Sequence, residues 1–241
     1  MAIPPLRKPG FSWERSNMAK TKHFGQHLAK AFTQHPRDNN DVEIEAYLDT
    51  PCQLSPPLKA FSPTQVRQVI KQLQPHNAPG YDLTDGTVLK NLPRKPIVLL
   101  TSIFNSMLRF CYFPVQWKYA QIIMIAKPGK PPKEASTYRQ ISLLPIMSKE
   151  FQRILLHRRD ETIYIDGLLP THQFGFRNKH YTIQQCHRVV TKIKESIEGK
   201  KMCTSVFVDI QQLFDKVCYR GLLYKLKPRL PDHLYLLLTE V

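Results

Sequence analysis

The chain has 241 residues, 42% of them hydrophobic, so it is long enough to bury a core and too apolar for a disordered polypeptide. Lys and Arg number 35 against 19 Asp and Glu, which gives a formal charge of +16 and indicates a polyanionic partner such as a nucleic acid. Charge alone leaves open a basic surface without a specific ligand.

The cysteines and the first residues bear on the compartment. The five cysteines are odd in number and show no Cys-x-x-Cys spacing, so we expect a reducing, intracellular environment without disulfides, with Cys203 as a small core residue. The opening MAIPPLRKPGF lacks the apolar stretch of a signal peptide, and no run is long enough for a membrane span. We expect a protein that is not secreted and has no membrane partner.

Two helices are predicted in the first third of the chain. One covers Ser12 to Thr33 and has apolar residues four apart on one face, at Phe24, Leu28 and Phe32. The next begins after Ser62 as N-cap, with Pro63 in the first turn and Gln65 completing a capping box. Its apolar face is formed by Val66, Val69, Ile70 and Leu73.

The centre of the chain predicts a buried helix over Ile97 to Phe110 and then a hairpin. Phe104 and Trp117 are expected in the core. The apolar run AQIIMIA and the run YRQISLLP are expected as its two strands, joined by the basic, proline-rich turn KPGKPPKEAST. Between residues 90 and 160 there are 13 Lys and Arg against 3 Asp and Glu. The positive charge is therefore concentrated around the hairpin.

The last third predicts helices over Ser148 to Thr162 and Thr182 to Glu198, a strand from Met202 to Asp209, and a helix from Tyr219. Val206, Phe207 and Val208 are consecutive apolar residues, so the strand is expected to be covered on both faces. Asp209 would then lie at the strand's carboxyl end, where α/β architectures place functional groups. An isolated acid there is more often a turn cap than a metal ligand.

The segment FVDIQQLFDKV resembles the first catalytic motif of reverse transcriptases from non-LTR retrotransposons, the jockey-like group most closely. Further blocks are similar to that family's motifs in the same order: NAPGYD with LTDGTVLKNLP, IFNSMLRFCYFPVQWKYAQIIMIAKPGKPP, YRQISLLPIMSKEFQRIL and HQFGFRNKHYTIQQCHRV. WERSNMAKTKHFGQHLAKAFTQHP resembles the family's stretch between endonuclease and polymerase. Ordered blocks of this kind are far more specific than one short motif.

The resemblance implies RNA-directed DNA polymerisation, with Mg²⁺, deoxynucleoside triphosphates, an RNA template and a DNA primer. Asp209 would be the catalytic acid and would hold the metals together with the Ile210 carbonyl. Phe214 would be the steric gate that rejects a ribose 2′-OH, although by position alone it reads as a core residue. Asp215 would make a structural hydrogen bond or ion pair.

The resemblance also assigns phosphate and template contacts. Lys127 and Arg139 flank the hairpin turn, and in the family these fingers fold over the incoming triphosphate. The plainer interpretation is two solvated cations. The loop beside the nascent base pair and template would contain an aromatic residue next to a cation, which suits base stacking; a hydrophobic plug with an exposed Arg is the alternative. Its residues are Gln173, Gly175, Phe176 and Arg177.

Several features depart from the family's pattern. The family's second catalytic block is an aromatic-Ala-Asp-Asp hairpin, and these 241 residues contain no adjacent Asp pair. The rest of the palm, the thumb and the upstream endonuclease are expected to be missing from this chain, and a lone acid is expected to hold Mg²⁺ weakly. Within the motifs, Ala126 replaces the Pro before Lys127, Gln140 the Pro after Arg139, and Leu213 the Ala before Phe214.

We therefore expect an α+β fold: helix-rich fingers with a basic β-hairpin, and an incomplete palm with a short sheet. Residues 1–61 are expected to be a linker or helical segment that precedes the polymerase. Residues 62–241 are expected to be a truncated reverse transcriptase domain, with the fingers and the first part of the palm, in the nucleus or a cytoplasmic ribonucleoprotein. Whether the chain is an enzyme is left open. The alternatives are a polymerase fragment that is inactive alone, a non-catalytic nucleic-acid-binding fragment, and a non-functional mobile-element remnant.

Overall fold

The computed structural model describes residues 3–7, 13–33, 41–52, 55–75, 77–162, 170–177, 179–210 and 212–240. The chain divides into two compact units. Unit 1 comprises Met1–Arg159 and Gln212–Val241, and unit 2 comprises Asp160–Gln211. Each unit is described by itself below, and the boundary expected at residue 61 stays a prediction.

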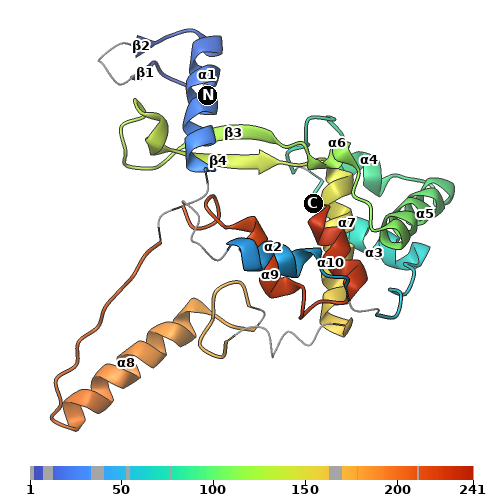
Figure 1. The fold of residues 1–241 in the computed structure, drawn as a ribbon. Coiled ribbons are helices and arrows are strands. Elements are labelled where there is room, and N and C mark those ends of the chain that lie inside the picture. The colour runs from blue at the N-terminus through green and yellow to red at the C-terminus, as the bar shows by residue number, and fades with distance from the viewer. Residues whose placement is uncertain are drawn as a thin grey trace. The chain divides into compact units, whose positions relative to one another are not determined.

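The described elements are mainly helical, with two small antiparallel sheets (Figure 1). The sheets pair β1 (Leu6–Arg7) with β2 (Trp13–Glu14), and β3 (Gln121–Ala126) with β4 (Tyr138–Leu143). The helices are α1 (Asn17–Ala31), α2 (Asp41–Asp49), α3 (Pro63–Lys71), α4 (Gly86–Lys90), α5 (Arg94–Phe110), α6 (Val115–Lys118), the 3-10 turn η1 (Ala135–Thr137), α7 (Ile146–Thr162), α8 (Thr182–Glu198), α9 (Tyr219–Leu226) and α10 (Asp232–Thr239). The α+β prediction is confirmed.

The main core of unit 1 is helical and lies between α3, α4, α5, α7 and α10. The predicted start of α3 is confirmed: the Ser62 hydroxyl accepts from the Gln65 backbone N–H, and the Gln65 side chain accepts from the Ser62 N–H. The predicted apolar face of α3 is buried at all four positions. Phe104 and Phe151 are also fully buried, and Trp117 packs against them, which confirms the expected core aromatic residues.

The NAPGYD loop packs directly on the junction between β4 and α7. A Cβ atom on Gly80 would lie 2.6 Å from the Pro145 nitrogen and 2.7 Å from the Leu144 carbonyl carbon, so backbone meets backbone there and only glycine fits. Lys149 adds a 3.5 Å hydrogen bond from its Nζ to the Ala78 carbonyl oxygen. Two of the motifs named above are thereby joined in unit 1.

Helix α1 lies beside the β3–β4 hairpin (Figure 1), and a smaller core joins the start of the chain to this hairpin. It contains Leu6 and Phe24 from the N-terminal segment and Ala135 and Tyr138 from the hairpin. The rings of Phe24 and Tyr138 meet edge to face at 5.0 Å. The predicted helix here is shorter than expected, because Ser16 caps α1 by accepting from the Ala19 N–H and residues 13 and 14 pair with β1.

The strand expected from Met202 to Asp209 is wrong. Residues 201–210 have no strand partner in the described part of the chain, and Val206, Phe207 and Val208 are 80%, 85% and 84% exposed. Cys203, expected in the core, is exposed as well. An apolar run becomes a strand only where another strand satisfies its backbone groups, and unit 2 supplies none among its described residues.

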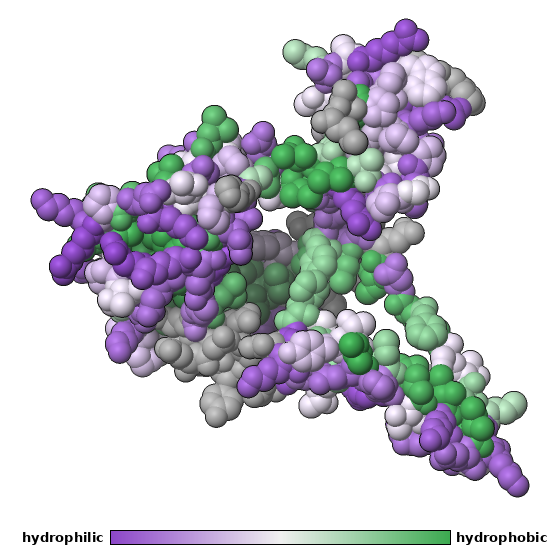
Figure 2. All heavy atoms as spheres, turned by 180° about the vertical axis from the view of Figure 1, so that it is seen from behind, coloured by the Kyte–Doolittle hydropathy of each residue, from purple (hydrophilic) through white to green (hydrophobic). Residues whose placement is uncertain are grey.

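α8 in unit 2 shows the same lack of cover. Its limits agree with the predicted Thr182 to Glu198, yet none of its residues is buried. Ile183, Val190 and Ile197 are each more than 60% exposed. Figure 2 shows hydrophobic side chains uncovered along this part of the molecule, at lower right. Over the residues that the structure describes, no helix has the length and apolarity needed to cross a bilayer.

Candidate functional site

The β3–β4 hairpin positions both predicted phosphate ligands. Lys127 directly follows β3, and its N–H donates to the Thr137 carbonyl at 2.8 Å, while Arg139 lies in β4 opposite Ile125. The Lys127 ammonium also donates to the Ser136 carbonyl at 2.8 Å. Arg139 is exposed.

Two further cations lie in the turn between the strands. Together with Lys127 and Arg139 they form a set that we call the hairpin cations: Lys127, Lys130, Lys133 and Arg139. Between residues 127 and 139 the sequence contains only one acid, Glu134. The turn is therefore a strongly basic, solvent-facing element, suited to phosphate oxygens.

Helix α1 adds positive charge next to the hairpin. It contains three lysines, two histidines and no acid. Partial burial lowers the pKa of His27, and the positive charges of His23, Lys127 and Lys30 lower it further. Lys127 of the hairpin and Lys30 of α1 thus both act on His27, so positive charge from the two elements meets there.

The predicted gate residue lies in a separate turn of unit 1. Residues 212–216 form a turn that we call the gate turn. In it, the Asp215 and Lys216 N–H groups both donate to the Gln212 carbonyl, at 3.0 and 3.1 Å. Gln212 has φ of 54°, a conformation that is uncommon for a residue with a side chain. Phe214 is 73% exposed, so it is not the core residue that its position alone would suggest.

The Asp215 carboxylate is engaged by one side chain across the sequence. Gln140 Nε2 donates to both Asp215 oxygens at 3.0 Å. This confirms the predicted structural hydrogen bond of Asp215. The donor, however, was not predicted, because nothing local in the sequence connects residues 75 positions apart.

The predicted template loop lies in unit 2 and is braced by its own contacts. The Gln173 N–H donates to the Pro170 carbonyl at 3.0 Å, and Arg177 Nη1 donates to the same carbonyl at 3.3 Å. Phe174 stacks edge to face on His180 at 5.0 Å, with the Arg188 guanidinium 5.2 Å from its ring. The Gln173 side-chain amide Nε2 donates a hydrogen bond to the Gly175 carbonyl at 3.5 Å. Phe176 has φ of 57°, and its side chain is 93% exposed.

The structure thus distributes the predicted site over two units. Lys127, Arg139 and Phe214 belong to unit 1. Asp209 and Ile210 belong to unit 2 and lie in its exposed extended segment. The template loop is another part of unit 2. Within the described ranges, no three His, Cys, Asp or Glu side chains are grouped so that they could hold a metal ion. Asp209 is a lone exposed carboxylate, so the described residues do not fit a two-metal centre.

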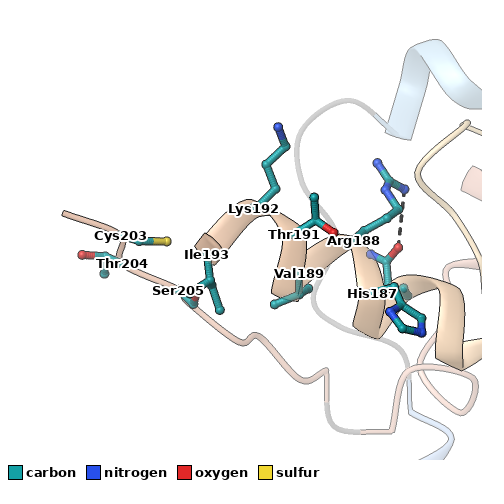
Figure 3. Close-up of a pocket in the computed structure, with 10 residues that line it drawn as sticks. His187, Arg188, Val189, Thr191, Lys192, Ile193, Cys203, Thr204 and Ser205 are labelled. Carbon is teal, nitrogen blue, oxygen red and sulfur yellow. Dashed lines mark hydrogen bonds between the residues drawn. The ribbon is translucent and has the colours of Figure 1, made fainter. Parts of the chain in front are cut away.

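Unit 2 also contains a groove of about 530 Å³ between α8 and the segment that follows it (Figure 3). Its walls include His187, Arg188 and Lys192 of α8 and residues 203–205 of the segment, without an acidic residue. Neither Asp209 nor the template loop lines it. The groove is therefore separate from the predicted catalytic, nucleotide-binding and template residues.

Comparison with known proteins decides the family. A family model described as reverse transcriptase (RNA-dependent DNA polymerase) matches residues 125–235, a stretch that includes the hairpin cations, the template loop and the gate turn. These residues belong to the reverse transcriptase family. Family polymerases typically use divalent metals.

Relatives extend this similarity over almost the whole chain. The chain is 40% identical over 237 residues to the RNA-directed DNA polymerase from mobile element jockey of Drosophila melanogaster, which covers 98% of the chain and 26% of the relative. It is 39% identical over 229 residues to the probable RNA-directed DNA polymerase from transposon X-element of the same species, covering 94% and 25%. The chain is also 30% identical over 189 residues to the putative 115 kDa protein in type-1 retrotransposable element R1DM of Drosophila melanogaster. This match covers 77% of the chain and 17% of the relative.

The chain therefore spans about a quarter of the length of its jockey and X-element relatives. Its jockey-like reverse transcriptase character, expected from the ordered motifs, is confirmed. The similarity includes the N-terminal segment that carries α1 and α2, upstream of the residues matched by the family model.

Proposed function

We propose that this chain is part of a non-LTR retrotransposon RNA-directed DNA polymerase, that it binds RNA through its hairpin cations, and that these 241 residues do not polymerise alone. Similarity to the jockey and X-element polymerases over nearly the whole chain supports the polymerase assignment. RNA template, DNA primer and deoxynucleoside triphosphates are the corresponding partners. Inside the cell the chain would act in the nucleus or in a cytoplasmic ribonucleoprotein, together with the endonuclease, palm and thumb of the full element.

The observation that carries the nucleic-acid contact is the composition and exposure of the hairpin. Its strands are fixed by six antiparallel residue pairs, and the small core with Phe24 holds one end of it against α1. The hairpin cations then project from a defined backbone. Arg139 can grip a phosphate through its planar fork, while the three lysines act as point charges.

The proposed nucleotide roles follow from the resemblance. Lys127 and Arg139 would hold the triphosphate, and Phe214 would lie against the sugar, where its ring leaves no room for a 2′-OH. In the complete enzyme, Asp209 and the Ile210 carbonyl would be two of the Mg²⁺ ligands, and the metal would supply positive charge for phosphoryl transfer. The Gln173–Arg177 loop would contact the template.

Proposed inactivity rests on the acids. These residues contain no adjacent Asp pair, and the second acid of the first motif, Asp215, is engaged by Gln140. Two like charges about 4 Å apart repel by roughly 4 kcal/mol at an effective dielectric of 20. Clustered acids and metals consequently stabilise each other, and a single carboxylate holds metals weakly.

An RNA titration at several salt concentrations tests the binding proposal. Replacing the four hairpin cations with Gln should weaken binding to single-stranded RNA and flatten the slope of log K against log salt by up to about 0.7 per lost phosphate contact. Little sequence preference is expected, because phosphate contacts carry no base information. The matched control replaces three lysines and one arginine that are exposed elsewhere in unit 1, Lys59, Arg67, Lys71 and Lys90, with Gln. Equal slopes for native and hairpin variants would show that these cations do not contact RNA.

Primer extension on an RNA template tests the catalytic part. The purified chain is expected to add no nucleotides with Mg²⁺ or Mn²⁺. Template-directed incorporation that disappears in Asp209→Ala would overturn the proposed inactivity. A chain that neither extends a primer nor binds RNA in a salt-dependent manner would instead be the non-functional remnant.

A further inference from the structure

Gln140 occupies a position at which the family motif usually has proline, and in this chain its side chain makes a contact that proline cannot make. Its amide Nε2 lies 3.0 Å from both oxygens of Asp215. Both residues belong to unit 1, and both are partly buried. A hydrogen bond to an ionised acceptor is stronger than a neutral one, and partial burial reduces competition from water.

The contact joins two elements that carry predicted nucleotide ligands. On the hairpin side, Gln140 follows Arg139 in β4 and pairs with Met124 of β3. Successive strand residues leave opposite faces, so Gln140 shares a face with Tyr138 and Met124, while Arg139 shares the other with Ile125. The Asp215 turn is therefore bound to the strand through the residue next to Arg139, without competing for its guanidinium.

On the other side, Asp215 closes the turn that carries Phe214. Its own N–H and that of Lys216 both donate to the Gln212 carbonyl. Gln212 is held at positive φ, a strained backbone for a residue with a side chain. Such a turn needs an outside contact to keep it in one conformation, and the bond to Gln140 is a contact of that kind between the turn and the hairpin.

We propose that Gln140 is a positioning residue that binds the Asp215 carboxylate and so holds the Phe214 turn against the nucleotide-binding hairpin. The role of Phe214 at the sugar rests on the proposed function, whereas the Gln140–Asp215 link does not. Through this link the gate turn and the strand that carries Arg139 move together. Proline at position 140 would leave the turn without this donor.

Hydrogen exchange measures the link directly. In Gln140→Leu, a replacement of similar length without a donor, the Asp215 and Lys216 amides should lose protection about tenfold. Amides of α3 and α5 in the main core should keep their protection, which shows that unit 1 remains folded. Gln121→Leu is the matched control, because Gln121 is an exposed residue of the neighbouring strand. Equal protection of Asp215 and Lys216 in native and Gln140→Leu chains would overturn the proposal.

A second variant separates a lost hydrogen bond from a change in packing. Gln140→Glu keeps the shape but sets one carboxylate against another. After correction for intrinsic exchange, protection of the Asp215 amide should be low at pH 7 and return in acid, where the introduced carboxyl is protonated and can donate again. Protection in Gln140→Glu that does not change with pH would likewise contradict the link.

Positioning of Phe214 has its own readout. With 4-fluorophenylalanine at residue 214, thymidine triphosphate should shift the fluorine resonance of the native chain, and Gln140→Leu should reduce that shift severalfold. No shift in the native chain would overturn the nucleotide role of Phe214, and with it the proposed function of this turn, while the exchange experiment still decides the link. A shift of equal size in both chains would overturn the positioning role.

Discussion

Glu150 shows how a single residue can set the pH dependence of this fold. It lies on α7 with its side chain 1% exposed, and one of its oxygens accepts from Arg153 at 2.8 Å. The other oxygen has no hydrogen-bond partner among the described residues. Burial raises the pKa of Glu150 to about 7, although Arg153 and Lys149 act to lower it. The carboxyl therefore binds its proton more tightly in the folded chain than in the unfolded chain.

Stability should accordingly fall as the pH rises from about 4.5 to about 7, the interval between the ordinary pKa and that of the folded state. Glu150→Gln should remove that fall and raise the free energy of unfolding at pH 8 by up to roughly 3 kcal/mol, the equivalent of the pKa difference. Urea unfolding at several pH values measures this. Glu195→Gln is the control: it breaks the exposed ion pair between Lys192 and Glu195, which are three residues apart like Glu150 and Arg153. This variant should change the free energy of unfolding by less than about 0.5 kcal/mol. A native chain as stable at pH 8 as at pH 5 would contradict the prediction.

Ser55 replaces a helix cap that the local sequence does not provide. Pro231 precedes α10 and offers no side-chain cap. The Ser55 hydroxyl accepts from the Asp232 N–H at 3.1 Å and donates to the Asp232 carboxylate. Burial acts to raise the pKa of Asp232, but hydrogen bonds with His233 and Ser55 lower it below its ordinary value. The cluster thus favours the ionised acid at the N-terminus of α10, as the helix dipole does.

Ser55→Ala should reduce the free energy of unfolding by about 1 kcal/mol, the usual cost of removing a cap. The folded pKa of Asp232 is depressed, so its ionised carboxylate also stabilises the fold. That stabilisation is present above the ordinary pKa of Asp232 and is lost as the pH falls through the lower, folded value. Denaturation at pH 7 and pH 3 checks both parts. Ser106→Ala, on the exposed surface of α5, serves as the control, and an equal loss in both variants would argue against a capping role.

At the scale of elements, a lysine, an ion pair and two tyrosine rings attach α2 to α9. Lys227 lies just after α9, and its ammonium donates to the carbonyls of Tyr47 and Leu48 at 2.9 Å and of Thr50 at 2.5 Å. These are C-terminal carbonyls of α2, where a cation is favoured by the helix dipole. Tyr224 stacks on Tyr47 at 4.8 Å, and Arg220 of α9 forms an ion pair with Glu45 of α2. Helix α2, which precedes α3 in the sequence, is thereby held by α9, which follows the gate turn.

Lys227→Met should open this contact and speed hydrogen exchange of the α2 amides by about tenfold or more, because three carbonyls lose their charged donor. The α3 and α5 amides should be unaffected. Lys225→Met is the matched control, since Lys225 is exposed and lies in α9, two residues before Lys227. Unchanged exchange of α2 in Lys227→Met would mean that the tyrosine rings and the Arg220–Glu45 ion pair hold the helix without the lysine.

At the scale of the whole molecule, the main liability is the uncovered apolar segment of unit 2. Val206, Phe207 and Val208 are exposed, and their backbone groups have no strand partner in the described residues. Extended segments of this kind pair with copies of themselves. The net charge of +16 opposes association but is concentrated outside this segment.

We expect the chain to associate with rising concentration through residues 205–209 and to be marginally stable. Val206→Lys with Val208→Lys should keep it monomeric in sedimentation experiments, because edge charges block strand pairing. Met18→Lys with Val42→Lys, at two exposed positions of unit 1, should leave the association unchanged. Strong, lasting amide protection of residues 206–208 in soluble monomer, with cooperative unfolding, would contradict this prediction.

The sequence by itself determined the features that depend on near neighbours. The capping box of Ser62 and Gln65, the limits of α8 and the paired strands of the hairpin follow from signals within a few residues. The ordered motifs likewise determined the family, because each is a short contiguous block. A structural hydrogen bond at Asp215 was also predictable.

Only the tertiary structure decided the rest. Whether Met202 to Asp209 forms a strand depends on a partner elsewhere in the chain, and without one among the described residues the apolar run is extended and exposed. The partner of Asp215 lies 75 residues away, the cap of α10 lies 177 residues away, and Phe214 is exposed although its residue type favours a core. Hydrophobicity and propensity act on every residue locally, whereas pairing, burial and capping across such separations exist only once the chain has folded.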